Sequence, residues 1–183
     1  MTDMKDEIKR LAKKYTKNII GLRRAIHQNP ELSFKEFETT KLIYNKLSGL
    51  KLDKVQRPSN TGVTALISNR KKGKCVALRA DIDALPIMEN TGLSFASKNP
   101  GIMHACGHDA HSAMLYGAAC ILKDLKKELN GSVKFIFQPA EEGAPKGEEG
   151  GAALMIKEGV LEQPKVEVIF GLHMDAQSEV NKL

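Results

Sequence analysis

A nine-residue stretch of the chain, MHACGHDAH at 103–111, concentrates side chains that bind metal ions. It holds three of the five histidines of the sequence, together with a cysteine and an aspartate. Thiolate, imidazole and carboxylate groups are the ligands that zinc and related metals take from proteins. In an extended segment alternate side chains point the same way, so the spacing Cys106-Gly107-His108 predicts that the thiol and the imidazole reach one metal cluster together.

Polar side chains also stand at or just behind the ends of three predicted strands. The strands are CVALRADI, SVKFIFQ and VEVIFGLH, and the polar residues at their ends are Asp81, Asp83, Glu141, Glu142 and His173. Ligands gather at the carboxyl ends of the strands in open α/β sheets. We therefore expect these side chains to converge with Cys106 and His108.

The adjacent pair Glu141 and Glu142 suggests two different roles. Neighbouring side chains of an extended segment point in opposite directions, so one glutamate can bind a metal while the other faces the substrate as a base. Any one of these residues alone is more often structural, but the combination at several strand ends is hard to explain by coincidence. The residues predicted to form the metal site are Cys106, His108, Glu142 and His173.

Four further residues with reactive side chains have simpler interpretations. Cys75 and Cys120 lie in apolar patterns and are predicted to be small core residues. His27 stands near the end of the first predicted helix, where a cationic side chain is favourable. Asp109 is either the N-cap of the helix that follows it or an additional residue of the site.

Composition excludes several classes of protein. The chain has 183 residues, 42% of them hydrophobic, which suits one globular domain. Its 28 Lys+Arg against 22 Asp+Glu are scattered and lack interleaved aromatic residues, so a nucleic acid partner is not expected. The three cysteines form no C-x-x-C pair, which predicts a reducing, cytoplasmic location. The N-terminus lacks the apolar stretch of a signal peptide and no apolar run reaches about 18 residues, so no membrane association is expected.

The elements that must position the site read as a layered α/β domain. Two helices come first, over residues 4–28 and about 34–47, ended by Asn29-Pro30 and by Gly49. GVTALIS and CVALRADI follow and are predicted to pair as a β-hairpin. A helix over 110–125, the strand SVKFIFQ, a short helix in GGAALMIKEGVL and the strand VEVIFGLH complete an alternating order, which is typical of an α/β fold.

Six blocks of the sequence, in this order, resemble the M20 metallopeptidases. They are LRRAIHQNPELSF, ALRADIDALPI, MHACGHDAHSAM, FQPAEEG, GGAALMIKEGVL and IFGLHMD. The chain is similar in particular to the branch of N-acyl amino acid amidohydrolases that includes hippurate hydrolases and indoleacetyl-amino acid hydrolases. The resemblance implies a zinc-peptidase-like α/β/α catalytic domain with a mixed central sheet, and hydrolysis of the amide bond of N-acyl amino acids or peptides.

The resemblance also implies roles for individual residues. It makes Cys106, His108, Glu142 and His173 ligands of two divalent metal ions, Glu141 the general acid and base, and Asp83 the acid that orients a ligand. The wider family has a His-x-Asp motif and an aspartate that bridges the metals, where this sequence has Asp81-Ile82-Asp83 and Cys106-Gly107-His108. A bridging Cys106 thiolate is our hypothesis, because a deprotonated sulfur can serve two cations. Such mixed ligands accept zinc, manganese, cobalt or nickel.

Two other functions fit the same residues. Cys106 could act as the nucleophile of a thiol hydrolase, with His108 or His104 as its base. The cluster could instead be a non-catalytic metal-binding remnant or storage site, although such a site has no use for the spare carboxylate of Glu141.

Family members of this kind are about twice as long as this chain. The resemblance therefore implies that residues 1–183 are the N-terminal portion of the catalytic domain. An inserted dimerisation domain and a C-terminal return segment with a last histidine ligand are expected to be missing, and a homodimer is expected only where that domain is present. On its own the chain is predicted to be marginally stable or prone to aggregation, and inactive or nearly so.

Overall fold

The computed structural model of the chain describes residues 3–69, 73–175 and 177–179. Five strands form one mixed sheet in the order β1-β2-β4-β3-β5. The strands are β1 (Lys54–Gln56), β2 (Val63–Ser68), β3 (Cys75–Asp81), β4 (Ser132–Gln138) and β5 (Val166–Gly171). The helices are α1 (Met4–His27), α2 (Phe37–Ser48), α3 (His108–Asp124), the 3-10 turn η1 (Lys126–Glu128) and α4 (Gly151–Lys157).

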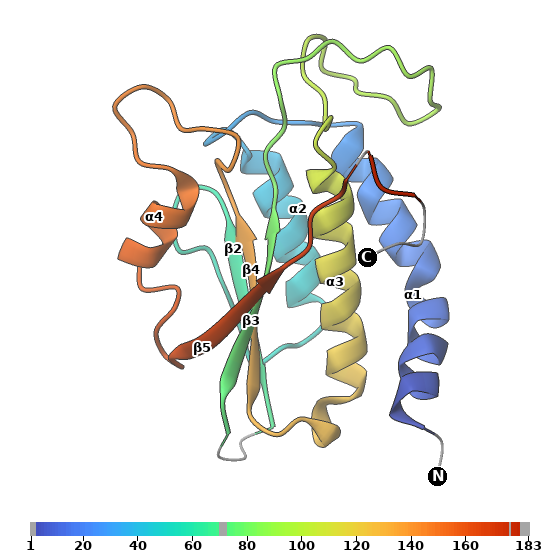
Figure 1. Ribbon diagram of the computed structural model, residues 1–183, viewed down its shortest axis with the longest axis vertical. Helices are drawn as coiled ribbons and strands as arrows, with labels where there is room; N and C mark the ends of the chain where they lie inside the picture. The colour runs from blue at the N-terminus through green and yellow to red at the C-terminus, as the bar shows by residue number, and fades with distance from the viewer. Residues whose placement is uncertain (1–2, 70–72, 176, 180–183) are drawn as a thin grey trace.

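The helices cover the sheet on both faces, which confirms the predicted layered α/β fold. Helices α1, α2 and α3 lie on one side of the sheet and α4 on the other (Figure 1). The larger core lies on the three-helix side and includes Leu22, Ile43 and Phe135. A smaller cluster, which includes Ile136 and Met155, lies between the sheet and α4. Phe135 and Ile136 are neighbours in β4, so this strand supplies side chains to both layers.

The predicted hairpin between GVTALIS and CVALRADI is wrong, because β4 lies between the two strands. β2 pairs with β4 in antiparallel fashion, and β3 pairs with β4 and with β5 in parallel fashion. The last five residues of β4 are all buried, so this strand needs a neighbour on each side. The short connection between the two strands predicted that they pair, but the burial of β4 on both sides outweighs this proximity.

The first two helices were predicted correctly in type and number. In α1 the Asp3 carboxylate accepts the N–H of Lys5, and Arg24 and His27 stand in the last turn, as a helix dipole favours. α2 begins three residues later than predicted. Phe34 has φ 59°, in the left-handed region, so the segment before Glu36 cannot continue a right-handed helix.

Three chain segments meet at the carboxyl end of β3 and β4: the two strand ends and the loop that leads to α3. In the parallel pair of β3 and β4, Asp81 lies opposite Gln138, so both strands finish side by side. The loop of residues 82–107 rises above these strand ends before the chain enters α3 (Figure 1). Within the described residues no helix combines the length and the apolar character needed to cross a bilayer.

Candidate metal centre

His108 is the first residue of α3 and lies at the centre of the site. Gly107, at φ 90°, is the N-cap of this helix, so the segment from Cys106 to His108 is not extended as predicted. It turns through a left-handed glycine into the helix, which also begins two residues earlier than predicted. Cys106 and His108 nevertheless converge: a cysteine sulfur and imidazole nitrogens from Cys106, His108 and His173 all lie within 4.8 Å of one another.

The His108 ring is held in one tautomer. Its Nδ1 lies 2.9 Å from the Asp83 carbonyl oxygen and 3.2 Å from Asp83 Oδ1. A carbonyl oxygen only accepts, so Nδ1 donates its hydrogen and the neutral ring has an unprotonated Nε2. Burial lowers the pKa of His108, but the hydrogen bond and charge of Asp83 outweigh it and raise the pKa overall.

In the neutral ring, the Nε2 atom of His108 carries no proton and faces two carboxylates. It lies 3.8 Å from Glu141 Oε2 and 3.8 Å from Glu142 Oε1. His108 Nε2 and Glu142 Oε1 are both buried, and neither has a hydrogen-bond partner among the described residues. Groups that only accept hydrogen bonds do not attract one another, so this arrangement suits a shared cation.

The two glutamates do not point in opposite directions, as an extended segment would require. Ala140, immediately before them, has φ 47°, and this left-handed residue turns the chain after β4. Both carboxylates consequently approach the same face of His108. They differ in exposure, since the Glu141 side chain is 37% exposed and that of Glu142 is 19% exposed.

Cys106 and His173 complete the cluster from two distant segments. Cys106 Sγ lies 3.3 Å from His173 Nε2, with His173 two residues beyond the end of β5. Burial, together with the neighbouring Glu142 and Glu141, raises the pKa of the Cys106 thiol to about 11. A cation among these groups would reverse that effect, because positive charge favours the thiolate.

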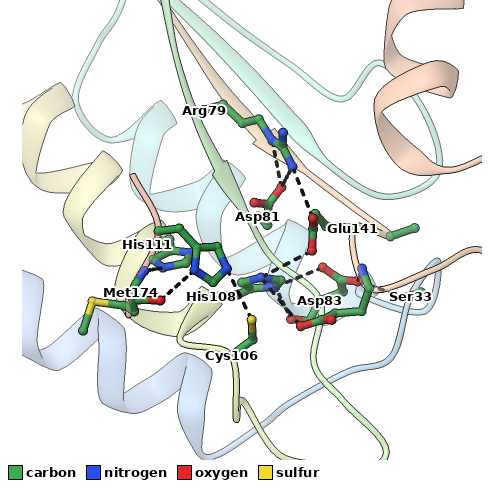
Figure 2. A network of polar contacts seen from close by, with 12 residues as sticks. Ser33, Arg79, Asp81, Asp83, Cys106, His108, His111, Glu141 and Met174 are labelled. Carbon is green, nitrogen blue, oxygen red and sulfur yellow. Dashed lines mark hydrogen bonds and ion pairs between the residues drawn. The ribbon is translucent and has the colours of Figure 1, made fainter. Parts of the chain in front are cut away.

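Asp83 connects the strand end to the other parts of the site. Besides its contact with His108, it accepts hydrogen bonds from Ser33 Oγ and from the backbone N–H of Glu142, each at 2.9 Å (Figure 2). Burial alone raises the pKa of Asp83, but these hydrogen bonds and His108 lower it overall. Asp83 is thus an ionised residue that holds the His108 ring and the start of the Glu142 segment.

Arg79 places a cation beside the acidic groups. Its Nε and Nη2 atoms donate to Asp81 Oδ1 at 2.9 and 2.7 Å, and Nη2 lies 4.0 Å from Glu141 Oε1 (Figure 2). Asp81 therefore has its own partner in Arg79. Burial raises the pKa of Asp81, and the Arg79 hydrogen bonds oppose that shift.

His111 belongs to the cluster, although sequence reasoning did not assign it there. Its ring centroid lies 5.4 Å from that of His108 and 4.8 Å from that of His173. Its Nε2 accepts the N–H of Met174 at 2.9 Å, next to His173 (Figure 2). Burial, together with the nearby His108 and His173, lowers the pKa of His111 to about 4. The spacing of three residues from His108 on one helix face was the available signal.

Ser33 and Arg79 also lie at the site without having been predicted. Both fall inside blocks that resemble the M20 family, but neither has a residue type that indicates metal chemistry by itself. Only the contacts with Asp83 and Asp81 reveal them.

A buried network next to the site shows what Asp109 and His27 contact. Asp109 is not the N-cap of α3, because Gly107 takes that position. The Asp109 Oδ2 atom instead contacts His27 Nδ1 at 2.9 Å and Arg23 Nε at 3.1 Å, which ties α1 to α3. His27 Nε2 reaches Glu89 at 3.2 Å, so this histidine is a buried structural contact at the end of α1.

The remaining cysteines and histidine lie apart from the cluster. Cys75 and Cys120 are 3% and 1% exposed, which confirms their prediction as core residues. His104 is buried, and burial lowers its pKa to about 4. Among the described residues, His104 is in none of the groups of ligand atoms that lie within 4.8 Å of one another.

Known proteins are similar in sequence to this chain. The sequence model of Peptidase family M20/M25/M40 matches residues 77–182. An N-acyl-L-amino acid amidohydrolase from Geobacillus stearothermophilus is 44% identical over 179 residues, which are 98% of this chain and 47% of the relative. An N-acetylcysteine deacetylase from Bacillus subtilis is 48% identical over 162 residues, 88% of this chain and 41% of that protein. The chain thus spans about half the length of the curated relatives it matches.

Solved structures share the fold. A Bacillus subtilis protein described as a dinuclear metal binding peptidase of the M20 family matches with a TM-score of 0.82 and 46% identity, over 90% of this chain and 45% of that one. A crystal structure from methicillin resistant Staphylococcus aureus matches with a TM-score of 0.85 and 44% identity, over 93% of this chain and 42% of the other. Because the family match covers more than half of the sequence and the fold agrees with a solved member, the chain belongs to Peptidase family M20/M25/M40.

Proposed function

We propose that this chain carries the metal centre of an enzyme that hydrolyses the amide bond of N-acyl amino acids or of peptides. The observation that carries the proposal is the buried pair of His108 Nε2 and Glu142 Oε1, which face each other at 3.8 Å without hydrogen-bond partners in the described chain. The names of the relatives support the reaction, since they include an N-acyl-L-amino acid amidohydrolase and a thermostable carboxypeptidase.

Four residues are proposed to hold two divalent cations: Cys106, His108, Glu142 and His173. Their sulfur, nitrogen and oxygen donors suit zinc, manganese, cobalt or nickel, and availability would select among these. When bound, such cations polarise a carbonyl group and make a water molecule more acidic. Asp83 contributes by holding the His108 ring so that its Nε2 lone pair faces the site.

Glu141 is proposed as the general acid and base. Its side chain is about twice as exposed as that of Glu142, so it can reach a water molecule and a substrate on the open side of the site. In hydrolysis, its carboxylate takes the proton of the attacking water and then gives it to the leaving amine. Nη2 of the neighbouring Arg79 lies 4.0 Å from Glu141 Oε1.

The two rival functions fit these contacts less well. A thiol hydrolase needs a Cys106 thiolate, but burial and the adjacent glutamates raise the pKa of this thiol to about 11. A storage site needs no carboxylate beyond its ligands, yet Glu141 lies as close to His108 as Glu142 does.

The remaining proposals concern the whole protein. We propose that residues 1–183 are the N-terminal portion of a catalytic domain, that the substrate is a small molecule, and that the protein works in the cytoplasm. Dimerisation is proposed only for a form with the inserted domain. The isolated chain is expected to bind cations but to turn over little or no substrate.

The test separates binding from chemistry with two neighbouring substitutions. Cobalt is titrated into wild type, Glu141→Gln and Glu142→Ala, and each is assayed with N-acetyl, N-benzoyl and N-indoleacetyl amino acids. Glu142→Ala should lose cobalt affinity, because a ligand is removed. Glu141→Gln should keep cobalt affinity, and in a complete enzyme the same change should lower turnover by at least about 100-fold, because the general base is lost. Equal cobalt affinity in wild type and Glu142→Ala would contradict the proposed ligands.

A further inference from the structure

A buried carboxylate from the N-terminal part of the chain contacts the backbone immediately before the two glutamates of the site. Glu36 is the N-cap residue of α2 and is fully buried. Its Oε1 accepts the backbone N–H of Ala140 at 2.9 Å, across 104 residues of sequence. Neither the proposed ligands nor the proposed acid and base chemistry uses this residue.

Ala140, the residue that Glu36 contacts, determines the direction of the two side chains that follow it. Ala140 has φ 47°, a left-handed conformation that a residue with a Cβ atom adopts only when its surroundings hold it there. The turn sends both Glu141 and Glu142 toward His108. A hydrogen bond to the Ala140 N–H therefore acts on the placement of two carboxylates at once.

Other contacts restrain the same turn from the sides. The Ala140 carbonyl oxygen accepts the N–H of Gly151 at 3.2 Å. A Cβ atom on Gly62 would lie 2.9 Å from Pro139 Cδ, so Gly62 leaves just enough room for the proline. Thr40, four residues after Glu36, accepts the N–H of Gly62 at 2.9 Å.

The segment that carries Glu36 also reaches the other strand end. Ser33 donates to Asp83, and Leu32 forms an isolated β-bridge with Ala84. One short connection between α1 and α2 thus holds the exit of β3 through Asp83 and the exit of β4 through Ala140. Burying a carboxyl group in this place is costly, because burial raises its pKa and disfavours its charge. A structural role in the core alone would be met at lower cost by an apolar side chain.

We propose that Glu36 is a positioning residue, which holds the Ala140 turn and thereby sets Glu141 and Glu142 around the cations. The inference rests on the proposed function for its cations, but the hydrogen bond itself is independent of them. It predicts that cation affinity depends on the reach of the side chain at position 36 and not on its charge.

The test compares cobalt binding by four variants of the 183-residue chain. Glu36→Gln keeps an acceptor oxygen at the same distance and should bind cobalt within about 3-fold of wild type. Glu36→Ala removes the acceptor oxygen. Glu36→Asp shortens the side chain by one methylene group. Each change should weaken cobalt binding by about 10- to 100-fold. Glu31→Ala is the matched control: the Glu31 carboxylate also accepts backbone N–H groups in this segment, from Glu38 and Thr39, but does not reach the turn. It should stay near wild type.

A double-mutant cycle distinguishes positioning from a general loss of stability. In a Glu142→Ala background the turn no longer presents a ligand, so Glu36→Asp should cost little further affinity. An equal loss in both backgrounds, or a loss in Glu31→Ala as large as in Glu36→Asp, would overturn the inference.

A second measurement needs no metal and keeps the two proposals distinguishable. The Ala140 amide should be protected from hydrogen exchange in wild type and Glu36→Gln, and should lose that protection in Glu36→Asp. An unprotected Ala140 amide in wild type would overturn the inference. Absence of cobalt binding by wild type, with the amide protected as expected, would instead contradict the proposed function while supporting the hydrogen bond.

Discussion

The Nε2 atom of His108, which carries no proton in the neutral ring, faces two carboxylates. The proton on the opposite nitrogen is held by Asp83, which also accepts the N–H of Glu142. One aspartate thereby orients an imidazole and fixes the backbone next to a proposed ligand. Losing a hydrogen bond that orients a ligand in this way typically lowers metal affinity by about 10- to 100-fold.

Glu36 predicts a pH dependence that can be measured on the metal-free chain. Burial raises its pKa above 4.5, with the Ala140 hydrogen bond opposing the shift. As pH rises from 4.5 to the folded pKa, the unfolded chain loses this proton first, so the folded state binds more protons and stability falls. Below 4.5 the group is protonated in both states, and above the folded pKa the penalty is constant.

The measurement is the free energy of unfolding against pH for wild type and Glu36→Gln. The difference between them isolates this one group from the other titrating residues. Wild type should lose stability relative to Glu36→Gln as pH rises above about 4.5. A relative gain over the same window would mean that the folded state favours the ionised carboxylate, contrary to the expected shift.

At the scale of elements, the site depends on how tightly α4 begins against the exit of β4. A Cβ atom on Gly151, the first residue of α4, would lie 1.7 Å from the Pro139 carbonyl oxygen. This oxygen belongs to the backbone, so it cannot move aside by a side-chain rotation. The start of α4 is therefore in close contact with the turn that precedes Glu141 and Glu142.

Gly151→Ala is expected to destabilise the chain by about 1–3 kcal/mol, as overpacking does, and to weaken cobalt binding because the turn must move. The control is Gly150→Ala. Gly150 has φ −60° and no described atom within 4 Å of an added Cβ, so its substitution should cost about 1 kcal/mol or less as a helix cap. Urea unfolding and cobalt titration measure both effects. Similar results for the two alanine variants would refute the role of the close contact.

At the scale of the whole molecule, β5 is an edge strand whose side chains are poorly covered by the rest of the described chain. Among the described strands it pairs only with β3. It presents exposed apolar side chains, listed here with their exposed fractions: Val168 42%, Ile169 46%, Phe170 57% and, just beyond the strand, Leu172 66%. An apolar strand with one unpaired edge is a site where copies of a chain associate.

The isolated chain should therefore self-associate as its concentration rises, and Phe170→Lys should reduce that association because an edge charge opposes strand pairing. Met88→Lys provides the control, since Met88 is 61% exposed but lies in the loop above the sheet. Sedimentation velocity over a range of concentrations measures the effect. A wild-type chain that stays monomeric throughout, or an equal effect of both lysine variants, would contradict the prediction.

Local patterns in the sequence were sufficient for much of this molecule. The apolar periodicity of α1 and α3 and the apolar runs of β3, β4 and β5 predicted these elements because amphipathic burial repeats within a few residues along the chain. The cluster of Cys106, His108, the two glutamates and His173 was likewise predictable. Its members stand in short motifs or at strand ends, and an α/β fold brings such ends together.

Tertiary structure alone decided which strands are neighbours and how the site is held. β4 separates β2 from β3, because pairing the most buried strand on both sides outweighs the proximity of a hairpin. The shared direction of Glu141 and Glu142 follows from the left-handed Ala140, and Ala140 is contacted by Glu36 from 104 residues away. Such contacts join residues whose spacing carries no periodic signal, so they are determined only when the whole chain packs.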